Sequence, residues 1–379
     1  MSTPTSIRTG ITLQHDPRAA ARELHAVLAQ PQTQLVVFFC PADFDLPALA
    51  AALREHFGDT EVIGCTTAGE ITPQGYLAGT VTGFSLAAPD FEVRTLLLGL
   101  DPFESATAGQ AVDRLVASLR GTGTAPTLAD TFAFMLIDGL SMQEELVVSC
   151  VHQHLAGIGL LGGSAADDTR FGTTHLYYRG QFHSKVALLA LVRSRLPFRA
   201  FRTQHFVRSE QRMVVTRADP SQRIVHEING LPAAREFARL VGLEVSELTP
   251  LIFATHPVVV RVGGETFVRS IAKVNPDDSL SFFCAIDEGI VLTIAKGADM
   301  VGNLQQAFDA VRESIGPPAL VLGCDCILRR LEYERDGIKD RVARIFSDNN
   351  VVGFATYGEQ FNSMHVNQTF TGIAIGSAA

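Results

Sequence analysis

This sequence repeats itself, and the repeat limits the folds that it can adopt. Residues 62–71 (VIGCTTAGEI) align with residues 351–360 (VVGFATYGEQ), at an offset of 351 − 62 = 289. The same offset continues without a gap and places Thr80 opposite Thr369. A weaker copy stands at residues 161–168 (LGGSAADD). Chance does not readily give three such stretches with similar flanks, so we expect a chain built from repeated structural units.

The flanks of these stretches predict one kind of unit. Residues 34–40 (QLVVFFC) form a continuous apolar run, which is typical of a strand that is buried on both faces. Residues 47–57 carry apolar side chains at helical spacing, and residues 80–87 indicate a further strand. Each unit is therefore expected to be strand, helix, strand, turn, strand. The fold class that follows is α/β, with the repeated units forming two mixed-sheet halves.

Three details of the later units are also predicted. A helix is expected over residues 142–155, with Ser141 as its N-cap. Residues 175–178 and 186–192 are expected to pair as a hairpin. In the third unit, residues 336–346 are expected to form the helix that precedes the last strands.

The length of 379 residues predicts two domains at the usual size of about 100 to 200 residues each. The basic, proline-containing stretch at residues 193–202 is the expected boundary. The sequence therefore predicts domains at residues 30–195 and 196–379. The match between the two ends of the chain suggests that residues 350–379 pack back on the N-terminal half.

The charge balance and the apolar runs exclude several classes of protein. Lys and Arg number 31 and Asp and Glu number 40, so the net charge is −9 and nucleic acid is not an expected partner. The longest uncharged apolar run, residues 186–192, is far too short to span a bilayer, and residues 1–10 show no signal-peptide core. Six dispersed cysteines indicate free thiols in a reducing compartment, and the expected location is the cytoplasm.

The repeated stretches also carry the candidate ligand-binding residues, because ligands in α/β sheets bind at the carboxyl ends of strands. Hydroxyl, thiol and acidic side chains gather there, and the acids are suited to an ammonium group. The candidates are Cys65, Thr66, Thr67, Glu70, Gly163, Ser164, Asp167, Thr356 and Glu359. The alternative interpretation is a set of tight turns, in which glycine supplies positive φ and the acids cap nearby N–H groups. A shared pocket is favoured for the three together, since turns alone need no common sequence.

Catalysis has no motif to support it. The glycine pair at residues 162–163 completes neither a dinucleotide-binding fingerprint nor a phosphate-binding loop. The stretch GGSAA is not a nucleophile elbow, because Ala166 stands where that motif requires glycine. Cys324 and Cys326 suggest half of a zinc site, but the other cysteines are isolated. The protein is therefore expected not to be an enzyme.

These stretches together resemble the FIST family, which combines an N-terminal and a C-terminal FIST domain. The resemblance rests on residues 63–71 (IGCTTAGEI), 159–168 (GLLGGSAADD), 214–232, 353–360 and 365–369 (HVNQT), and it covers the chain from about residue 30 to the end. It implies a ligand-binding sensory protein in signal transduction, with amino acids as suggested ligands. The family often has a cysteine followed by an arginine at one strand end, which corresponds here to Cys324 with Arg329 or Arg330.

Stand-alone bacterial members similar to this chain include haem proteins that sense nitric oxide and regulate a histidine kinase. By this resemblance, haem b is the expected cofactor, and His365 of HVNQT is the expected iron ligand, with Asn367 near it. Cys40, which precedes a proline, is the next candidate for the iron ligand. Two alternatives stay open, namely a sensor of free amino acids or related metabolites without haem, and a scaffold without a ligand. The partner is expected to be a histidine kinase or another signalling protein in trans, and an oligomer is compatible with the sequence.

Overall fold

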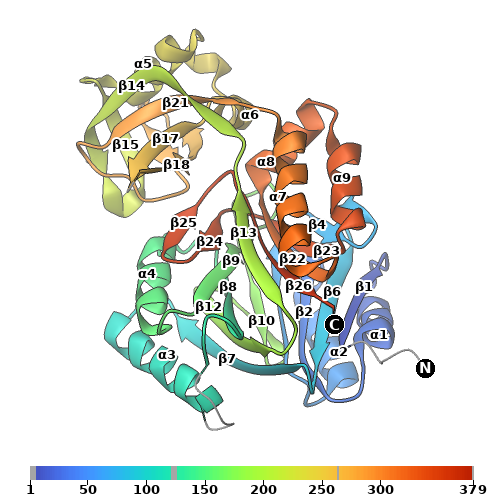
Figure 1. Cartoon of the computed structure of the whole chain (residues 1–379). Helices are drawn as coiled ribbons and strands as arrows, with labels where there is room; N and C mark the ends of the chain where they lie inside the picture. The colour runs from blue at the N-terminus through green and yellow to red at the C-terminus, as the bar shows by residue number, and fades with distance from the viewer. Residues whose placement is uncertain (1–5, 121–125, 263, 378–379) are drawn as a thin grey trace.

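The fold is a ring of three similar units with a smaller lobe inserted in the third (Figure 1). The computed structural model describes residues 6–120, 126–262 and 264–377. Each unit follows one order along the chain, namely strand, helix, strand, helix, strand, short hairpin, strand, except that two helices stand at the second helical place of the third unit. The repeat that is visible in the sequence is therefore a repeat of whole structural units. In the first and second units it also includes a first strand and a first helix that the sequence pattern did not reveal.

The first unit begins at residue 7, and both of its helices start with an aspartate cap followed by proline at the first or second helical position. The Asp16 carboxylate accepts a hydrogen bond from the backbone N–H of Ala19, and Asp45 does the same for Ala48. Its elements are β1 (Ile7–Thr12), α1 (Pro17–Leu28), β2 (Thr33–Pro41), α2 (Leu46–Phe57), β3 (Val62–Thr67), β4 (Glu70–Thr72), β5 (Gly75–Leu77) and β6 (Val81–Ala87).

The second and third units repeat this order. The second comprises β7 (Phe91–Gly99), α3 (Ser105–Arg120), β8 (Thr131–Ile137), α4 (Glu144–His154), β9 (Gly159–Ser164), β10 (Leu176–Tyr178), β11 (Gln181–His183) and β12 (Val186–Ser194). The third comprises β13 (Phe198–Thr203), α7 (Met300–Ile315), β22 (Pro318–Cys326), α8 (Ile327–Arg335), α9 (Lys339–Asp348), β23 (Val351–Thr356), β24 (Glu359–Phe361), β25 (Met364–Val366) and β26 (Phe370–Gly376).

Each unit completes the sheet of a neighbour. The first sheet has the strand order β1-β6-β2-β3-β10-β11, so its last two strands are the hairpin of the second unit. In the same way, the second sheet ends in β24 and β25 of the third unit, and the third sheet ends in β4 and β5 of the first unit. The exchange of hairpins is therefore cyclic and closes the ring.

Equivalent backbone hydrogen bonds mark the three junctions. In each, an N–H just beyond a strand end donates to a carbonyl of the neighbouring unit. The bonds are Ala68 to Ala355 at 3.0 Å, Ala166 to Thr66 at 2.9 Å and Tyr357 to Ser164 at 3.4 Å. The donors and the acceptors occupy matching positions of the three repeats, so the sequence alignment is also a structural one.

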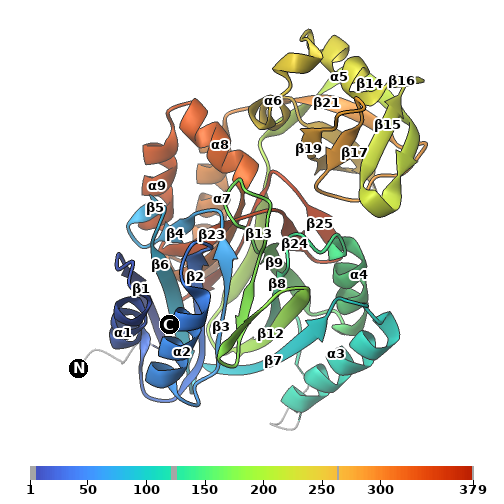
Figure 2. The ribbon, with the colours of Figure 1, turned by 180° about the vertical axis from the view of Figure 1, so that it is seen from behind.

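The three sheets face one central apolar core, and the helices cover their outer faces (Figures 1 and 2). Along β2, Val37 and Phe39 point to the centre, whereas Val36 and Phe38 pack under α1 and α2. Alternate side chains of one strand thus enter two different cores. This is why residues 35–40 are apolar without interruption.

The lobe lies between β13 and α7 in the chain and has a sheet and an apolar core of its own. It stands at the end of the ring that carries β24, β25 and α4 (Figures 1 and 2). Its elements are β14 (Phe206–Asp219), η1 (Pro220–Gln222), β15 (Ile224–Ile228), β16 (Leu231–Pro232), α5 (Ala233–Val241), η2 (Val245–Glu247), α6 (Pro250–Thr255), β17 (Val258–Val262), β18 (Glu265–Arg269), β19 (Ile271–Val274), β20 (Leu280–Phe282) and β21 (Val291–Gly297).

The α/β class predicted from the sequence is confirmed, and the repeated units assemble as three sheets rather than as two halves. The boundary expected at residues 195/196 falls between β12 and β13, where the second unit ends. Residues 350–379 were expected to pack on the N-terminal half, and in the structure β23 pairs with β4 and β24 pairs with β9. None of the helices in the described ranges is long and apolar enough to cross a membrane.

Three local predictions differ from the structure. β10 forms its hairpin with β11, and β12 instead pairs with β7 and β8. The helix predicted over residues 336–346 is present as α9, but it starts only at Lys339, because Gly337 adopts a positive φ of 64° between α8 and α9. The N-cap of α4 is Gln143 rather than Ser141. Met142 has a positive φ of 56°, which lies outside the right-handed helical region, so the helix cannot begin at that residue.

Candidate functional site

Two of the repeated stretches contain the same hydrogen-bonded cluster, in which a buried glutamate accepts hydrogen bonds from two threonines. We call each of these clusters a lock. In the first, Thr67 Oγ1 donates to Glu70 Oε1 at 2.5 Å, and the N–H and hydroxyl of Thr80 both donate to Glu70 Oε2 at 3.3 Å. Burial raises the pKa of Glu70 to about 7, against the opposing effect of these hydrogen bonds. The carboxylate thus fastens the hairpin β4–β5 to the strand before it and the strand after it.

The second lock lies 289 residues further along the chain. Thr356 donates to Glu359, and the N–H and hydroxyl of Thr369 donate to Glu359 Oε2 at 3.2 Å and 2.7 Å. Burial raises the pKa of Glu359 to about 8. Because both locks satisfy their own carboxylates, these glutamates and threonines hold the scaffold together and do not present free groups to a ligand.

The other predicted residues at the junctions also have internal partners. Thr66 Oγ1 accepts from the N–H of His175 at 3.1 Å, and Ser164 Oγ accepts from Gln360 Nε2 at 3.0 Å. Asp167 accepts from two backbone N–H groups and from the hydroxyl of Tyr357. These residues come together at the ring junctions, where their observed contacts are structural.

Cys65 and Gly163 lie in the same packed region. Cys65 is fully buried, and burial raises the pKa of its thiol well above the ordinary value. A Cβ on Gly163 would lie 2.7 Å from the ring of Phe354, so no side chain fits there. Neither position faces open space.

A comparison of the first and third hairpins shows where the copies differ. Five positions between the matching lock residues carry different side chains in the two hairpins. In the first hairpin they are Ala68, Ile71, Tyr76, Ala78 and Gly79. In the third hairpin they are, in the same order, Tyr357, Gln360, His365, Asn367 and Gln368. We call these last five residues the polar wall. All five are at most 3% exposed. Since the first hairpin forms the same structure without them, formation of the hairpin itself does not require these five side chains.

Several atoms of the polar wall have no hydrogen-bond partner among the described residues. They are His365 Nε2, Gln360 Oε1 and both amide atoms of Asn367. Two of them converge on Gly358, because a Cβ at that glycine would lie 2.7 Å from His365 Nε2 and 2.9 Å from Asn367 Nδ2. Buried polar atoms without partners are costly and uncommon, so the described part of the protein does not by itself satisfy this cluster.

His365 is neutral at physiological pH. Burial lowers the pKa of its imidazole to about 4, opposed by the carboxylate of Glu145 and reinforced by the guanidinium groups of Arg223 and Arg269. Its Nδ1 lies 3.4 Å from Gln360 Nε2. The site therefore contains an uncharged imidazole surrounded by charged side chains from the lobe and from α4.

The lobe is fastened beside the polar wall by one arginine and two glutamates, which we call the clasp. Arg223 Nη2 of the lobe donates to Glu144 at 2.6 Å and to Glu145 at 2.5 Å, both at the start of α4. Glu145 also accepts from the N–H of Ala285 at 2.6 Å. Burial raises the pKa of Glu144 to about 7, although Arg223 opposes the shift.

The lobe also contacts the wall directly. Gln368 Nε2 donates to the carbonyl of Ala254 at 2.7 Å, and Gln368 Oε1 accepts from the hydroxyl of Ser270 at 3.3 Å. The ring of Tyr357 also faces Phe283 of the lobe, with centroids 6.3 Å apart. The polar wall thus lies at the boundary between the ring of units and the lobe. We call this boundary, with the polar wall and the clasp, the seam.

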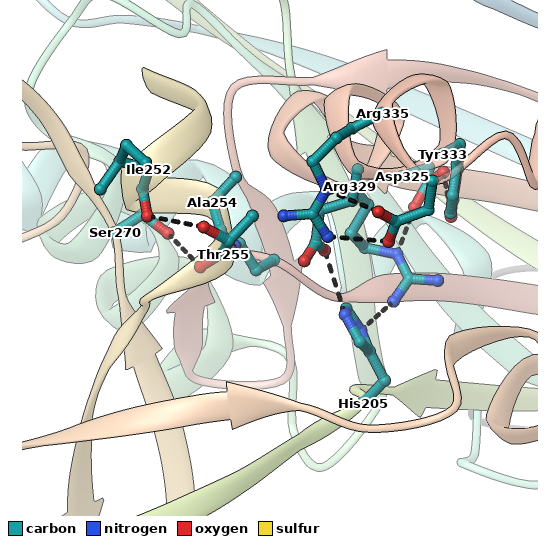
Figure 3. A network of polar contacts seen from close by, with 12 residues as sticks. His205, Ile252, Ala254, Thr255, Ser270, Asp325, Arg329, Tyr333 and Arg335 are labelled. Atoms are coloured by element: carbon teal, nitrogen blue, oxygen red, sulfur yellow. Dashed lines mark hydrogen bonds and ion pairs between the residues drawn. The ribbon is translucent and has the colours of Figure 1, made fainter. Parts of the chain in front are cut away.

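The two linkers of the lobe meet at a buried polar network (Figure 3). The N–H of Ala298 donates to the carbonyl of His205 at 2.7 Å, so the outgoing and returning chains are joined. The His205 side chain lies 3.1 Å from Arg329 Nη1 and 3.0 Å from Glu332 Oε2, and Arg329 in turn binds Asp325 at 2.7 Å. Burial and Arg329 lower the pKa of His205 to about 2, so it is neutral.

This network explains the cysteine and arginine of the predicted strand-end motif. Arg329 is the fully buried arginine of α8, whereas Arg330 contacts the carbonyl of Ala68 at a ring junction. Cys324 packs in the central core and Cys326 in the core under α7, α8 and α9. Across the part of the chain that the structure describes, no group of three or more potential ligands is placed to hold a metal ion.

Haem does not fit this arrangement of the seam. His365 presents a neutral nitrogen without a partner, as an iron ligand must. The groups around it are the amides of Gln360 and Asn367 and the charges of the clasp, whereas a porphyrin needs broad apolar faces. Cys40 is fully buried, and burial raises the pKa of its thiol well above the ordinary value, so it is not poised as a thiolate ligand.

Comparison with known proteins places the chain in a family. Residues 34–231 match the family model of the FIST N domain, and residues 233–362 match that of the FIST C domain. The chain belongs to the FIST family. FIST domains are associated with the sensing of small ligands in signal transduction. The chain is also 21% identical to the uncharacterized protein MJ1623 of Methanocaldococcus jannaschii, over 85% of this chain and 69% of that protein. The junction of the two FIST models falls inside the lobe, just before α5.

Sequence reasoning found His365 and Asn367 but missed much of the seam. Gln360 was detectable, because the two copies differ at that position while their lock residues agree. Arg223 and Glu145 carry no comparable signal. They are 78 residues apart, and only the docked lobe brings them together.

Proposed function

We propose that this FIST protein is a sensor that binds a small polar ligand, a free amino acid or a related metabolite, at the seam between the ring and the lobe. One observation carries the proposal: the third hairpin has five buried polar residues where the first folds with other side chains, and several of their atoms lack partners. Buried polar groups of this kind are retained for recognition rather than for stability.

The chemistry of the seam suits a ligand with both a donor and an acceptor end. Gln360 Oε1 and Asn367 Oδ1 are acceptors for an ammonium or amide N–H. Asn367 Nδ2 and Arg269 Nε, which also has no partner among the described residues, are donors for a carboxylate. An amino acid carries both ends, and the neutral His365 adds a group that takes either role.

Binding at the seam gives the protein a means of signalling. A ligand held between the polar wall and the lobe stabilises one position of the lobe relative to the ring, and the two linkers at His205 and Ala298 are the points where the lobe turns. A partner in trans, such as a histidine kinase, reads the position of the lobe. The role is sensory and not catalytic.

Haem with nitric oxide is the second candidate, and only the unpartnered nitrogen of His365 favours it. It requires the lobe to move away from the wall, since the groups next to His365 are polar. Haemin titration of the purified protein tests it. A Soret band that His365→Ala abolishes would favour haem over an amino acid.

The main experiment is a thermal-shift screen of the common amino acids. We expect one or a few to raise Tm, and the shift should vanish in Asn367→Ala and in His365→Ala. Ser363→Ala is the matched control, because Ser363 is exposed at the tip of the same hairpin. A ligand whose shift survives both wall substitutions would bind elsewhere and would contradict the proposal.

A further inference from the structure

The cyclic exchange of hairpins creates the same junction three times, between a helix and the hairpin of the next unit. The helices are α2, α4 and α9, and the hairpins are β10–β11, β24–β25 and β4–β5 respectively. At one register position the hairpins carry Phe182, His365 and Tyr76, each opposite the second residue of the partner strand. An aromatic side chain therefore stands at the same place in every junction.

What covers these three rings differs. Tyr76 packs near Tyr333 of α8 and Phe346 of α9, with ring centroids 6.3 Å and 6.4 Å away. His365 lies in the seam beside the lobe. Phe182 lines a cavity of about 1040 Å³ between α2 and β11, which we call the first crevice. That volume accommodates a drug-sized molecule.

The lining of the first crevice is mostly apolar, in contrast to the seam. Its apolar and small residues come from the start of α2 and from the hairpin. They are Ala42, Phe44, Leu46, Pro47, Ala50, Ala51, Gly180 and Phe182. At the position that corresponds to Gln360 of the seam, the hairpin carries Tyr177, whose ring lies 5.3 Å from that of Phe182.

Polar side chains also contribute to this lining, namely His175, Gln181 and three charged residues. His175 lines the crevice, and its Nδ1 is buried without a hydrogen-bond partner in the described part of the chain. Burial lowers the pKa of His175, so the ring is neutral and offers a single hydrogen bond. Asp45, Arg54 and Glu55 also line the crevice, giving it a net charge of 1 − 2 = −1. Asp45 is occupied in capping α2, where it accepts from Ala48.

We propose that the first crevice is a second binding site, which takes an uncharged aromatic molecule that carries one hydrogen-bonding group. The aromatic body lies against Phe44, Phe182 and the alanines of α2, and the polar group binds His175 Nδ1. Anions are disfavoured by the carboxylates of the lining. One scaffold thus provides two sites of opposite polarity, a polar seam beside the third hairpin and an apolar crevice beside the second.

The test uses N-phenyl-1-naphthylamine, a neutral aromatic probe with one N–H donor whose fluorescence rises in apolar surroundings. We expect saturable binding to the full-length protein. Ala51→Trp, on the exposed face of α2, fills the crevice and should abolish it. The matched control is Ala117→Trp, at an exposed position on α3, which should bind like the wild type. Equal binding by Ala51→Trp and the wild type would overturn the proposal.

Two further measurements define the ligand class. His175→Phe keeps a ring but removes the nitrogen, and it should weaken binding of the probe about tenfold, the value of one hydrogen bond. The anionic analogue 1-anilinonaphthalene-8-sulfonate should bind several-fold more weakly than the neutral probe. If the sulfonate bound more tightly, the assignment to an uncharged ligand would be wrong. Seam variants such as Asn367→Ala should leave probe binding unchanged, so this test is independent of the proposed sensory site.

Discussion

The first and third hairpins are two versions of one structure within a single chain. Both are anchored by a glutamate between two threonines, and both complete the sheet of another unit. Between the anchors, the first hairpin carries Ala68, Ile71 and Ala78 where the third carries Tyr357, Gln360 and Asn367. The conserved part of this internal comparison identifies what the fold needs. The divergent part identifies what one copy has gained beyond the fold.

The locks should be equivalent, and this gives the largest expected effect. Glu70→Ala and Glu359→Ala each leave two buried hydroxyls and one N–H without their acceptor. We expect each substitution to lower the free energy of unfolding by about 3 kcal/mol. Urea unfolding measures it. If one variant lost most of its stability and the other almost none, the two hairpins would not be structural equivalents.

The clasp belongs to the third hairpin's surroundings alone, and its loss should be the next largest effect. Arg223→Ala leaves Glu144 buried without its partner, and we expect a cost of about 2 kcal/mol, reduced because Glu144 can take up a proton. Hydrogen exchange should rise in the lobe and in α4 but not in α1 or α2. Arg217→Ala is the control, since its pair with Glu227 is largely exposed, and it should leave exchange unchanged.

Giving the third hairpin the residues of the first should sharpen the comparison. The double variant Gln360→Ile, Asn367→Ala removes three buried atoms that lack partners. We expect stability to rise by about 1 kcal/mol while the ligand-induced shift in Tm disappears. Chemical denaturation with and without the ligand measures both. A loss of stability instead would show that the polar wall supports the fold.

The smallest effect is a dependence of stability on pH. Burial raises the pKa of Glu70 to about 7 and of Glu359 to about 8, from an ordinary value of 4.5. These two glutamates therefore bind more protons in the folded state than in the unfolded state, and their contribution to the free energy of unfolding should fall as pH rises from about 4.5 through 8. Tm should decline by a few degrees between pH 6 and pH 9. Glu359→Gln should flatten this decline, and an unchanged slope would contradict the shift.

The sequence predicted the parts of the fold that rest on local patterns. The strand at residues 34–40 was predictable because its side chains face two apolar cores, which gives an apolar run in the sequence. The lock residues were predictable as a repeat because they bind one another within a short stretch of chain. The ring arrangement was not predictable, because the pairing of β24 with β9 depends on contacts across about two hundred residues. For the same reason His365 was identified as a candidate from its motif, whereas Arg223 and Glu145 became visible only when the lobe was in place.

The cyclic exchange of hairpins has a consequence for how the chain is made. Ile71 of β4 pairs with Gly353 of β23, so the sheet that receives the first hairpin cannot form until residues 351–356 have left the ribosome. Until then β4 and β5 have no strand to pair with outside their own hairpin, and the first unit lacks the sheet that its hairpin completes. Contacts of such long separation form slowly. The ring therefore closes only after the third unit has been made, and removal of residues 350–379 would disrupt the first unit as well as the third.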